Sequence, residues 1–326
     1  MQYRNRSVLP HFAGLQDLVN DPDVKEIIVN NNTEVWAERT AGLERAGSLA
    51  PGEAAALLER LLAPIGRRID LSSPVVDARL SDGSRLCAAI PPVSPYGLCL
   101  TIRRFSTTTL GISSFANGRV TDLLHSVVHQ RRNIVIAGAT STGKTTLLSA
   151  LASEAPPNER LVVLEDTNEL AVAHPHVVYL ESRPSSAEGM TEISLSHLVR
   201  HALRLRPDRL IVGEVRGPEA FDMLQAMNTG HAGSMSTCHA NSAHDALYRL
   251  ESMVLQATPN WPLPAVRSYI ASAIDVVVFV ERCPQGSRHV AQIVEIGDAL
   301  TTHGTYSTSV LAHSLHPSNG DLALVI

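Results

Sequence analysis

The sequence predicts an α/β protein, with a smaller α/β amino-terminal domain before a larger domain built on a mostly parallel sheet with helices on both faces. In residues 119–326, short apolar runs typical of strands alternate with helix-forming segments. In residues 1–105, strand-like runs are joined by tight turns. Residues 106–118 are rich in Thr, Ser and Gly and predict a linker. At 326 residues, 44% of them hydrophobic, the chain is long enough for two cores.

In the first domain we expect helices over 12–20 and 51–62 and strands over 24–29, 34–38, 75–80, 85–90 and 98–103. Pro51 suits the first turn of its helix, where the missing N–H would have no partner, and the leucines of residues 57–62 form an apolar stripe. Asp82-Gly83 and Pro95-Tyr96-Gly97 are turn signals. The strands on either side of each turn should therefore pair antiparallel.

In the second domain we expect helices over 121–130, 144–153, 195–205, 218–228, 243–255 and 264–272, and strands over 133–138, 161–165, 210–212, 234–237, 275–281 and 290–295. This alternation favours a parallel sheet with its ligand at the carboxyl ends of the strands. Residues 182–191 contain a proline, three serines and a glycine and predict a surface loop.

A phosphate-binding loop is the most informative motif of the chain. Residues 138–145 fit G-x-x-x-x-G-K-[ST] directly after an apolar strand. The two glycines let the backbone wrap closely around phosphate groups, and the following helix directs its positive end at them. Lys144 would reach the β and γ phosphates of a nucleoside triphosphate, and the Thr145 hydroxyl would bind Mg²⁺. The predicted nucleotide-binding residues are Gly138, Ala139, Thr140, Ser141, Thr142, Gly143, Lys144, Thr145 and Thr146.

Acidic residues follow two further buried strands. Glu165 and Asp166 end the run at 161–164, and Glu214 ends the run at 210–213. A carboxylate there can hold Mg²⁺ or polarise an attacking water. Successive strand residues face opposite sides, so only one of Glu165 and Asp166 should face the nucleotide. Asp208 lies about 20 Å from Glu214 along an extended strand, so we interpret it as structural.

Four motifs in order identify a family resemblance: residues 138–145, 164–170 (LEDTNEL), 204–217 (RLRPDRLIVGEVRG) and 228–241 (NTGHAGSMSTCHAN). Together they resemble the type II/IV secretion ATPases, and within that superfamily they are most similar to the CpaF/TadA ATPases of tight-adherence (Flp) pilus systems. Segments at 67–74, 77–85 and 100–105 extend the likeness into the first domain.

The resemblance implies a RecA-like ATPase domain behind a smaller α/β domain, assembled as a hexameric ring. ATP hydrolysis with Mg²⁺ would drive pilus assembly together with inner-membrane platform proteins. It implies that Lys144 and Thr145 hold phosphate and Mg²⁺, that Glu165 activates water and that Glu214 supports Mg²⁺ or the water. His231 and His239 match the histidine box of the family, as sensors of the γ-phosphate. Arg103 and Arg104 match its phosphate-contacting arginine pair.

These residues also have simpler interpretations. A cluster with zinc-like composition is formed by His231, Cys238, His239 and His244. Cys238 and His239 should face opposite sides of a strand, which argues against a shared metal. Either of His231 and His239 can instead be a packed histidine satisfied by one hydrogen bond. Arg103 and Arg104 can be solvated charges at a strand end.

Three other functions stay open. A conjugative or type IV secretion ATPase would use the same motor. A RecA-like nucleic-acid translocase would contact phosphates through arginines, although the chain has only two Trp for stacking. A nucleotide-binding scaffold would bind without hydrolysis. The arginines in question are Arg200, Arg204, Arg206 and Arg209.

Composition and charge predict the compartment. The longest apolar runs are far shorter than the roughly 20 residues that span a bilayer, and no apolar segment of a secretory signal follows Met1. The four cysteines show no C-x-x-C spacing, which is typical of reduced thiols. A net charge of −5 gives no general reason to bind nucleic acid. We expect a cytoplasmic protein that reaches the inner face of the membrane through a platform protein.

Overall fold

The computed structural model describes residues 15–39, 42–104, 110–183, 191–283, 287–314 and 322–323. The chain divides into two compact units, Met1–Thr107 and Thr108–Ile326. The predicted linker therefore contains the boundary between the units. Its later part, including Ile112 and Phe115, is buried in the core of the second unit. Residues 106–109 of the linker, residue 105 before it and residues 184–190 of the predicted surface loop lie outside the described residues.

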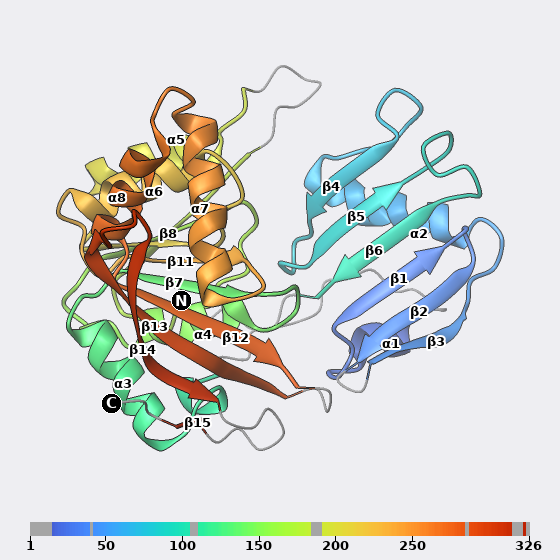
Figure 1. Ribbon diagram of the computed structural model, residues 1–326. Coiled ribbons are helices and arrows are strands. Elements are labelled where there is room, and N and C mark those ends of the chain that lie inside the picture. Colours follow the sequence, from blue (N-terminus) through green and yellow to red (C-terminus); the bar gives the residue numbers. More distant parts are fainter. Residues whose placement is uncertain are drawn as a thin grey trace. The chain divides into compact units, whose positions relative to one another are not determined.

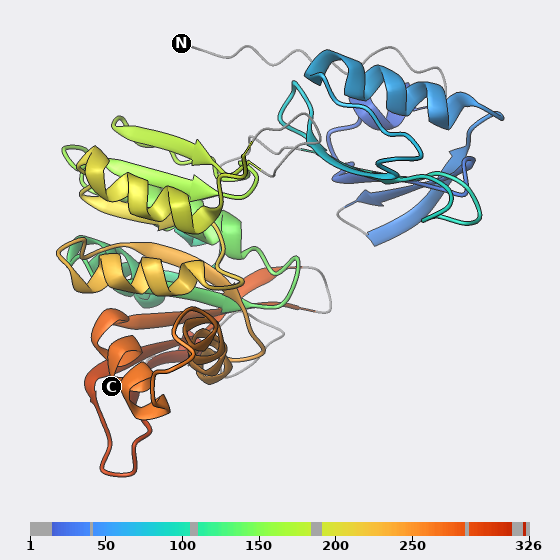
Figure 2. The ribbon, with the colours of Figure 1, turned by 90° about the horizontal axis from the view of Figure 1, so that it is seen from above.

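The first unit is an antiparallel sheet packed against helices. Its elements are α1 (Gln16–Asn20), β1 (Glu26–Asn30), β2 (Glu34–Arg39), β3 (Gly42–Ser48), α2 (Glu53–Leu62), β4 (Val75–Arg79), β5 (Arg85–Ala89) and β6 (Cys99–Arg103). The strand order is β3-β2-β1-β6-β5-β4. The leucine stripe of α2 is buried in the same core as Ile27, Leu86 and Ile102 of the sheet, and Figure 2 shows α2 along one face of the sheet.

The second unit carries a nine-stranded sheet. Its strands are β7 (Ile134–Gly138), β8 (Leu161–Glu165), β9 (Val177–Glu181), β10 (Arg209–Val212), β11 (Met235–His239), β12 (Val276–Arg282), β13 (Arg288–Leu300), β14 (Tyr306–Ser314) and β15 (Leu322–Ala323). Their order is β15-β14-β13-β12-β7-β11-β10-β8-β9. The strands from β12 to β9 run parallel, and β13 to β15 continue the sheet antiparallel.

Helices cover both faces of this sheet (Figure 1). They are α3 (Gly118–His129), α4 (Lys144–Ser153), α5 (Leu195–Ala202), α6 (Glu219–Asn228), α7 (Ala243–Ala257) and α8 (Leu263–Ala273). α3 and α4 pack on one face and α5 to α8 on the other. Each residue of β7 and β8 is buried. Strands that are buried on both faces have continuous apolar sequences, which is why these two were predictable. The predicted α/β class with a mostly parallel sheet is confirmed.

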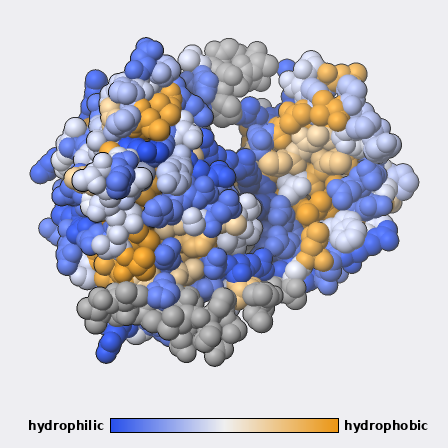
Figure 3. All heavy atoms as spheres, in the orientation of Figure 1, coloured by the Kyte–Doolittle hydropathy of each residue, from blue (hydrophilic) through white to orange (hydrophobic). Residues whose placement is uncertain are grey.

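Four described strands lie outside the predicted set: β3, β9, β14 and β15. Two of them, β3 and β9, show why. β3 is an edge strand with six of its seven residues exposed, so it carries no hydrophobic alternation. β9 is an edge strand on the other sheet, with three half-buried residues and two exposed ones. The surface in Figure 3 is mostly hydrophilic with separate hydrophobic patches. Among the described helices, none is long and apolar enough to cross a membrane.

Candidate functional site

The phosphate loop leaves the carboxyl end of β7 and leads directly into α4. Gly138 has no room for a side chain, because a Cβ atom there would lie 2.5 Å from the Val280 carbonyl oxygen. Gly143 has φ +94°, a conformation that favours glycine, and a Cβ there would lie 2.8 Å from Arg288 Cδ. Both glycines of the motif are therefore required by the local geometry as well as by phosphate approach.

Lys144 lies folded over its own loop. Its Nζ donates a hydrogen bond of 2.8 Å to the Ala139 carbonyl and lies 3.3 Å from His239 Nδ1. The Thr142 hydroxyl donates to the same carbonyl at 2.9 Å. Only 7% of the Lys144 surface is exposed. A phosphate in the loop would replace the Ala139 carbonyl as the partner of the ammonium group.

Three parallel strands bring the predicted charged residues to one edge. His239 ends β11, which lies between β7 and β10, and Glu214 follows β10. His239 Nε2 lies 2.9 Å from Glu214 Oε1. Burial lowers the pKa of His239, an effect that the Glu214 carboxylate opposes. A neutral ring with its proton on Nε2 would accept from Lys144 and face Glu214 with its N–H.

Glu214 has a second partner that the predicted set of site residues omitted. Arg216 Nη2 donates to Glu214 Oε2 at 2.6 Å, and this bond raises the pKa of Arg216. The spacing of two residues in an extended segment, which puts both side chains on one side, is the signal that could have identified the pair. Arg216 thus holds one carboxylate oxygen, and His239 lies beside the other.

Glu165 is the inward-facing member of the acidic pair. Its side chain is buried, and its Oε1 accepts from the backbone N–H groups of Glu169 and Leu170 at 2.9 Å each. Asp166 is exposed and accepts from the Ser182 hydroxyl at 3.0 Å. Burial raises the pKa of Glu165 to about 7, although the two backbone hydrogen bonds act in the opposite direction.

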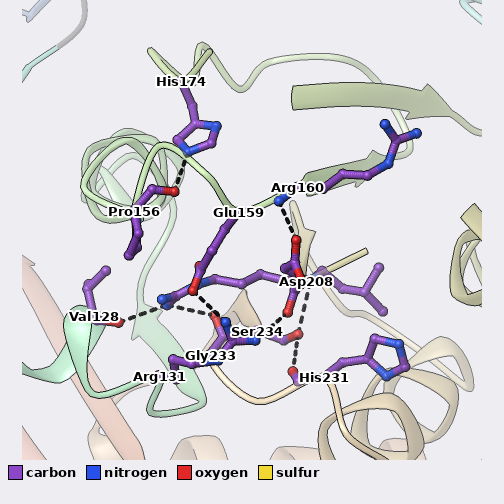
Figure 4. A network of polar contacts seen from close by, with 12 residues as sticks. Val128, Arg131, Pro156, Glu159, Arg160, His174, Asp208, His231, Gly233 and Ser234 are labelled. Carbon is purple, nitrogen blue, oxygen red and sulfur yellow. Dashed lines mark hydrogen bonds and ion pairs between the residues drawn. The ribbon is translucent and has the colours of Figure 1, made fainter. Parts of the chain in front are cut away.

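Not every predicted site residue lies at this edge. His231 precedes β11, and because β11 runs parallel to β7, it lies at the end of the sheet away from the loop. There its carbonyl accepts from the Ser234 hydroxyl at 2.7 Å (Figure 4). Asp208 is at the same end and accepts from the backbone N–H of Arg160 at 2.7 Å. Within the unit, only His239 of the two box histidines contacts the phosphate-loop lysine.

The burial of Cys238 and Arg209 argues against the zinc-site and nucleic-acid interpretations. Cys238 is buried in the core beneath α5 to α8, and burial raises the pKa of its thiol to about 12. A protonated thiol in an apolar core does not suit a zinc ligand. Arg209 is completely buried and paired with Glu159, so it is not available to nucleic-acid phosphates.

Arg103 and Arg104, at the end of β6 in the first unit, differ in their contacts and exposure. Arg104 Nη1 donates to the carbonyl oxygens of Asp21 and Val24, the latter at 3.1 Å. Arg103 is exposed at the end of β6, opposite Glu26 of β1. Arg104 therefore has a structural role within its own unit.

The residues that suit Mg²⁺ lie with the loop. Thr145 and Thr146 are half-buried in the first turn of α4, after Lys144, and Glu214 lies at the same edge of the sheet. Hydroxyl and carboxylate oxygens are the hard ligands that Mg²⁺ prefers. The donor set present therefore fits a nucleotide-bound magnesium ion.

The sequence and the fold are both similar to those of known proteins. Residues 11–313 match the family described as Type II/IV secretion system protein. Type IV secretion system protein PtlH of Bordetella pertussis is 36% identical over 330 residues, covering 90% of this chain and 95% of PtlH. Conjugal transfer protein TrbB of Rhizobium radiobacter is 32% identical over 294 residues, covering 87% of each chain. The structure of the Yersinia pseudotuberculosis ATPase DotB is similar in fold, with a TM-score of 0.62 at 18% identity, covering 93% of this chain and 83% of that chain.

Proposed function

Because this chain belongs to the type II/IV secretion system protein family, we propose that it is an ATP-hydrolysing motor of a secretion or pilus-assembly system. The observation that carries the proposal is the convergence of Lys144, His239 and Glu214 at the edge of the sheet where the phosphate loop lies. A scaffold that only bound nucleotide would need the loop but not a histidine and a carboxylate beside its lysine.

Each residue has a distinct part in this proposal. Lys144 exchanges the Ala139 carbonyl for phosphate oxygens and neutralises charge that develops on them. Thr145 and Glu214 would hold Mg²⁺, which when bound adds further charge neutralisation. Glu165 would accept the proton of the attacking water, for which a pKa near 7 is suitable. His239, in contact with both Lys144 and Glu214, would respond to the presence of a γ-phosphate.

Phosphate release by the purified full chain tests this function. We expect slow, Mg²⁺-dependent ATP hydrolysis that falls at least about 100-fold in Lys144→Ala and in Glu214→Gln, because each removes charge that acts in the transition state. Arg204→Gln, at an exposed position at the opposite end of the sheet, is the control and should retain wild-type activity. Wild-type rates in Lys144→Ala or Glu214→Gln would refute the site.

The system served by the motor is a further part of the proposal. The ordered motifs favour a tight-adherence pilus, whereas PtlH and TrbB are named for type IV secretion and conjugal transfer. Deleting the gene and measuring both surface pili and plasmid transfer distinguishes the two. Loss of pili with normal transfer supports tight adherence, and the reverse result supports conjugation.

We also propose that the chain works as a hexamer on the cytoplasmic face of a membrane, recruited by platform proteins. Support comes from membership of a secretion family together with described helices that do not span a bilayer. Cell fractionation with and without the platform proteins tests the recruitment. Membrane association that persists without any partner would contradict it.

A further inference from the structure

Two arginines lie directly opposite each other at the end of the β12–β13 hairpin. Arg282 and Arg288 are cross-strand partners, two positions beyond the pair Val280 and Val290. Both valines are buried in the core under α3 and α4. Since strand residues two positions apart share a face, the arginines lie on the face that carries α4.

Arg288 reaches the phosphate loop. Its Cδ lies 2.8 Å from the point that a Cβ atom on Gly143 would occupy, and Phe115 Cε1 lies 2.9 Å from the same point. Gly143 immediately precedes Lys144 and the first turn of α4. The guanidinium group of Arg288, attached to that Cδ, is therefore a near neighbour of the loop that should receive phosphate.

Several positive charges lie close together at this place. Like charges directly opposite each other in a sheet are destabilising, and the amino end of α4 adds about half a positive charge. Lys144 supplies a further full charge at the same helix end. Among the described residues, Arg282 forms no ion pair. Such an arrangement becomes favourable when an anion binds beside it.

We propose that Arg288, with Arg282 behind it, is a nucleotide-binding residue that contacts the phosphates nearest the nucleoside. This inference rests on the proposed ATPase function. The side of the loop decides which phosphates are involved. His239 and Glu214 mark the γ-phosphate end on the β11 and β10 side of β7, whereas Arg288 lies on the β12 side. Arg288 therefore binds ADP and ATP alike and does not sense hydrolysis.

Binding of fluorescent ADP and ATP to the full chain tests the proposal. Arg288→Gln keeps the length of the stem against Gly143 but removes the charge. We expect the Kd for both nucleotides to rise about tenfold, the size of one lost charge-assisted contact, and the KM for ATP to rise with kcat unchanged. Arg288→Lys should recover part of the loss. Arg282→Gln, at an exposed position, should show a smaller rise.

Arg204→Gln is the matched control, an exposed arginine that should leave both Kd values unchanged. Wild-type Kd values in Arg288→Gln would overturn this inference and leave the ATPase proposal intact. A loss confined to ATP would also overturn it, because it would place Arg288 at the γ-phosphate. If the wild-type chain bound neither nucleotide, while its circular dichroism showed a folded protein, the proposed function itself would fail.

Discussion

The two oxygens of the Glu165 carboxyl have different surroundings. Oε1 accepts two backbone hydrogen bonds that hold residues 169 and 170, whereas Oε2 is buried and has no hydrogen-bond partner among the described residues. The side chain also packs tightly on Gly213, where a Cβ atom would lie 2.8 Å from Glu165 Cγ. Oε1 thus holds the backbone at residues 169 and 170, and Oε2 is the oxygen that can take up a proton.

The raised pKa of Glu165 predicts opposite pH dependences of stability and activity. The carboxyl has a pKa of about 7 when folded, against an ordinary value of 4.5, so the folded chain binds more protons between these values. Its contribution to the free energy of unfolding should be full below about pH 4.5 and be lost as the pH rises to about 7, on the order of 3 kcal/mol in total. Hydrolysis should instead rise through pH 7, as the base ionises.

Glu165→Gln provides the control for both effects. Its amide oxygen can accept the same two backbone N–H groups, but it neither titrates nor accepts a proton. Denaturant unfolding at several pH values measures how the free energy of unfolding depends on pH, and this dependence should be weaker in the variant than in the wild-type chain. The variant should also bind ATP but hydrolyse little of it. Equal pH slopes in the two proteins would show that Glu165 does not carry the effect.

At the scale of elements, the end of the sheet away from the nucleotide is joined by a buried ion pair (Figure 4). Arg209, the first residue of β10, has no exposed surface and pairs with Glu159, which precedes β8. Its Nη1 also donates to the carbonyl of Val128 in α3 at 2.8 Å. Arg131 pairs with the same glutamate. These contacts join the carboxyl end of α3 to the starts of β8 and β10, the two strands that lead to Glu165 and Glu214 at their other ends.

Removing one partner of this pair should be costly. Arg209→Ala leaves the largely buried Glu159 with only the more exposed Arg131 as its partner, and we expect the free energy of unfolding to fall by about 3 kcal/mol. Denaturant titration measures the change, and Arg204→Ala, which is exposed, should alter it by less than about 0.5 kcal/mol. A loss below about 1 kcal/mol in Arg209→Ala would show that the pair is dispensable.

At the scale of the whole molecule, each unit has its own core, and the arginines at the end of β6 belong to the first. Ring assembly and domain closure would let one or both of them act on a nucleotide held by the second unit. The two arginines differ within the first unit, because Arg104 donates hydrogen bonds to two carbonyl oxygens whereas Arg103 is exposed.

We therefore predict different outcomes for the two alanine variants. Arg103→Ala should lower ATP hydrolysis and leave the melting temperature unchanged, because an exposed strand-end charge adds little stability. Arg104→Ala should lower both. Phosphate release, thermal unfolding and light-scattering mass, with and without a non-hydrolysable ATP analogue, provide the measurements. A monomer with full activity in both variants would contradict the ring motor.

Most elements of the second unit could be predicted because their signals are local. The bounds of α4 and β8 agree with the prediction residue for residue, since a buried strand is a short apolar run and the loop glycines fix where the helix begins. Gly138 to Thr145 required no knowledge of the fold, because the chemistry of phosphate binding is contained in eight consecutive residues. The edge strands β3 and β9 lack such a signal.

Neighbours across the sheet, in contrast, depend on strand order, which no local pattern encodes. Placing β11 between β7 and β10 brings His239 to Lys144 and Glu214, and it leaves the other box histidine, His231, at the far end of the same sheet. Placing β12 and β13 on the other side of β7 brings Arg288 to Gly143. The sequence by itself therefore determined the phosphate loop and its strand and helix. Only the tertiary structure decided which residues contact one another around the loop, because His239, Glu214 and Arg288 lie about 70 to 145 positions from it in the chain.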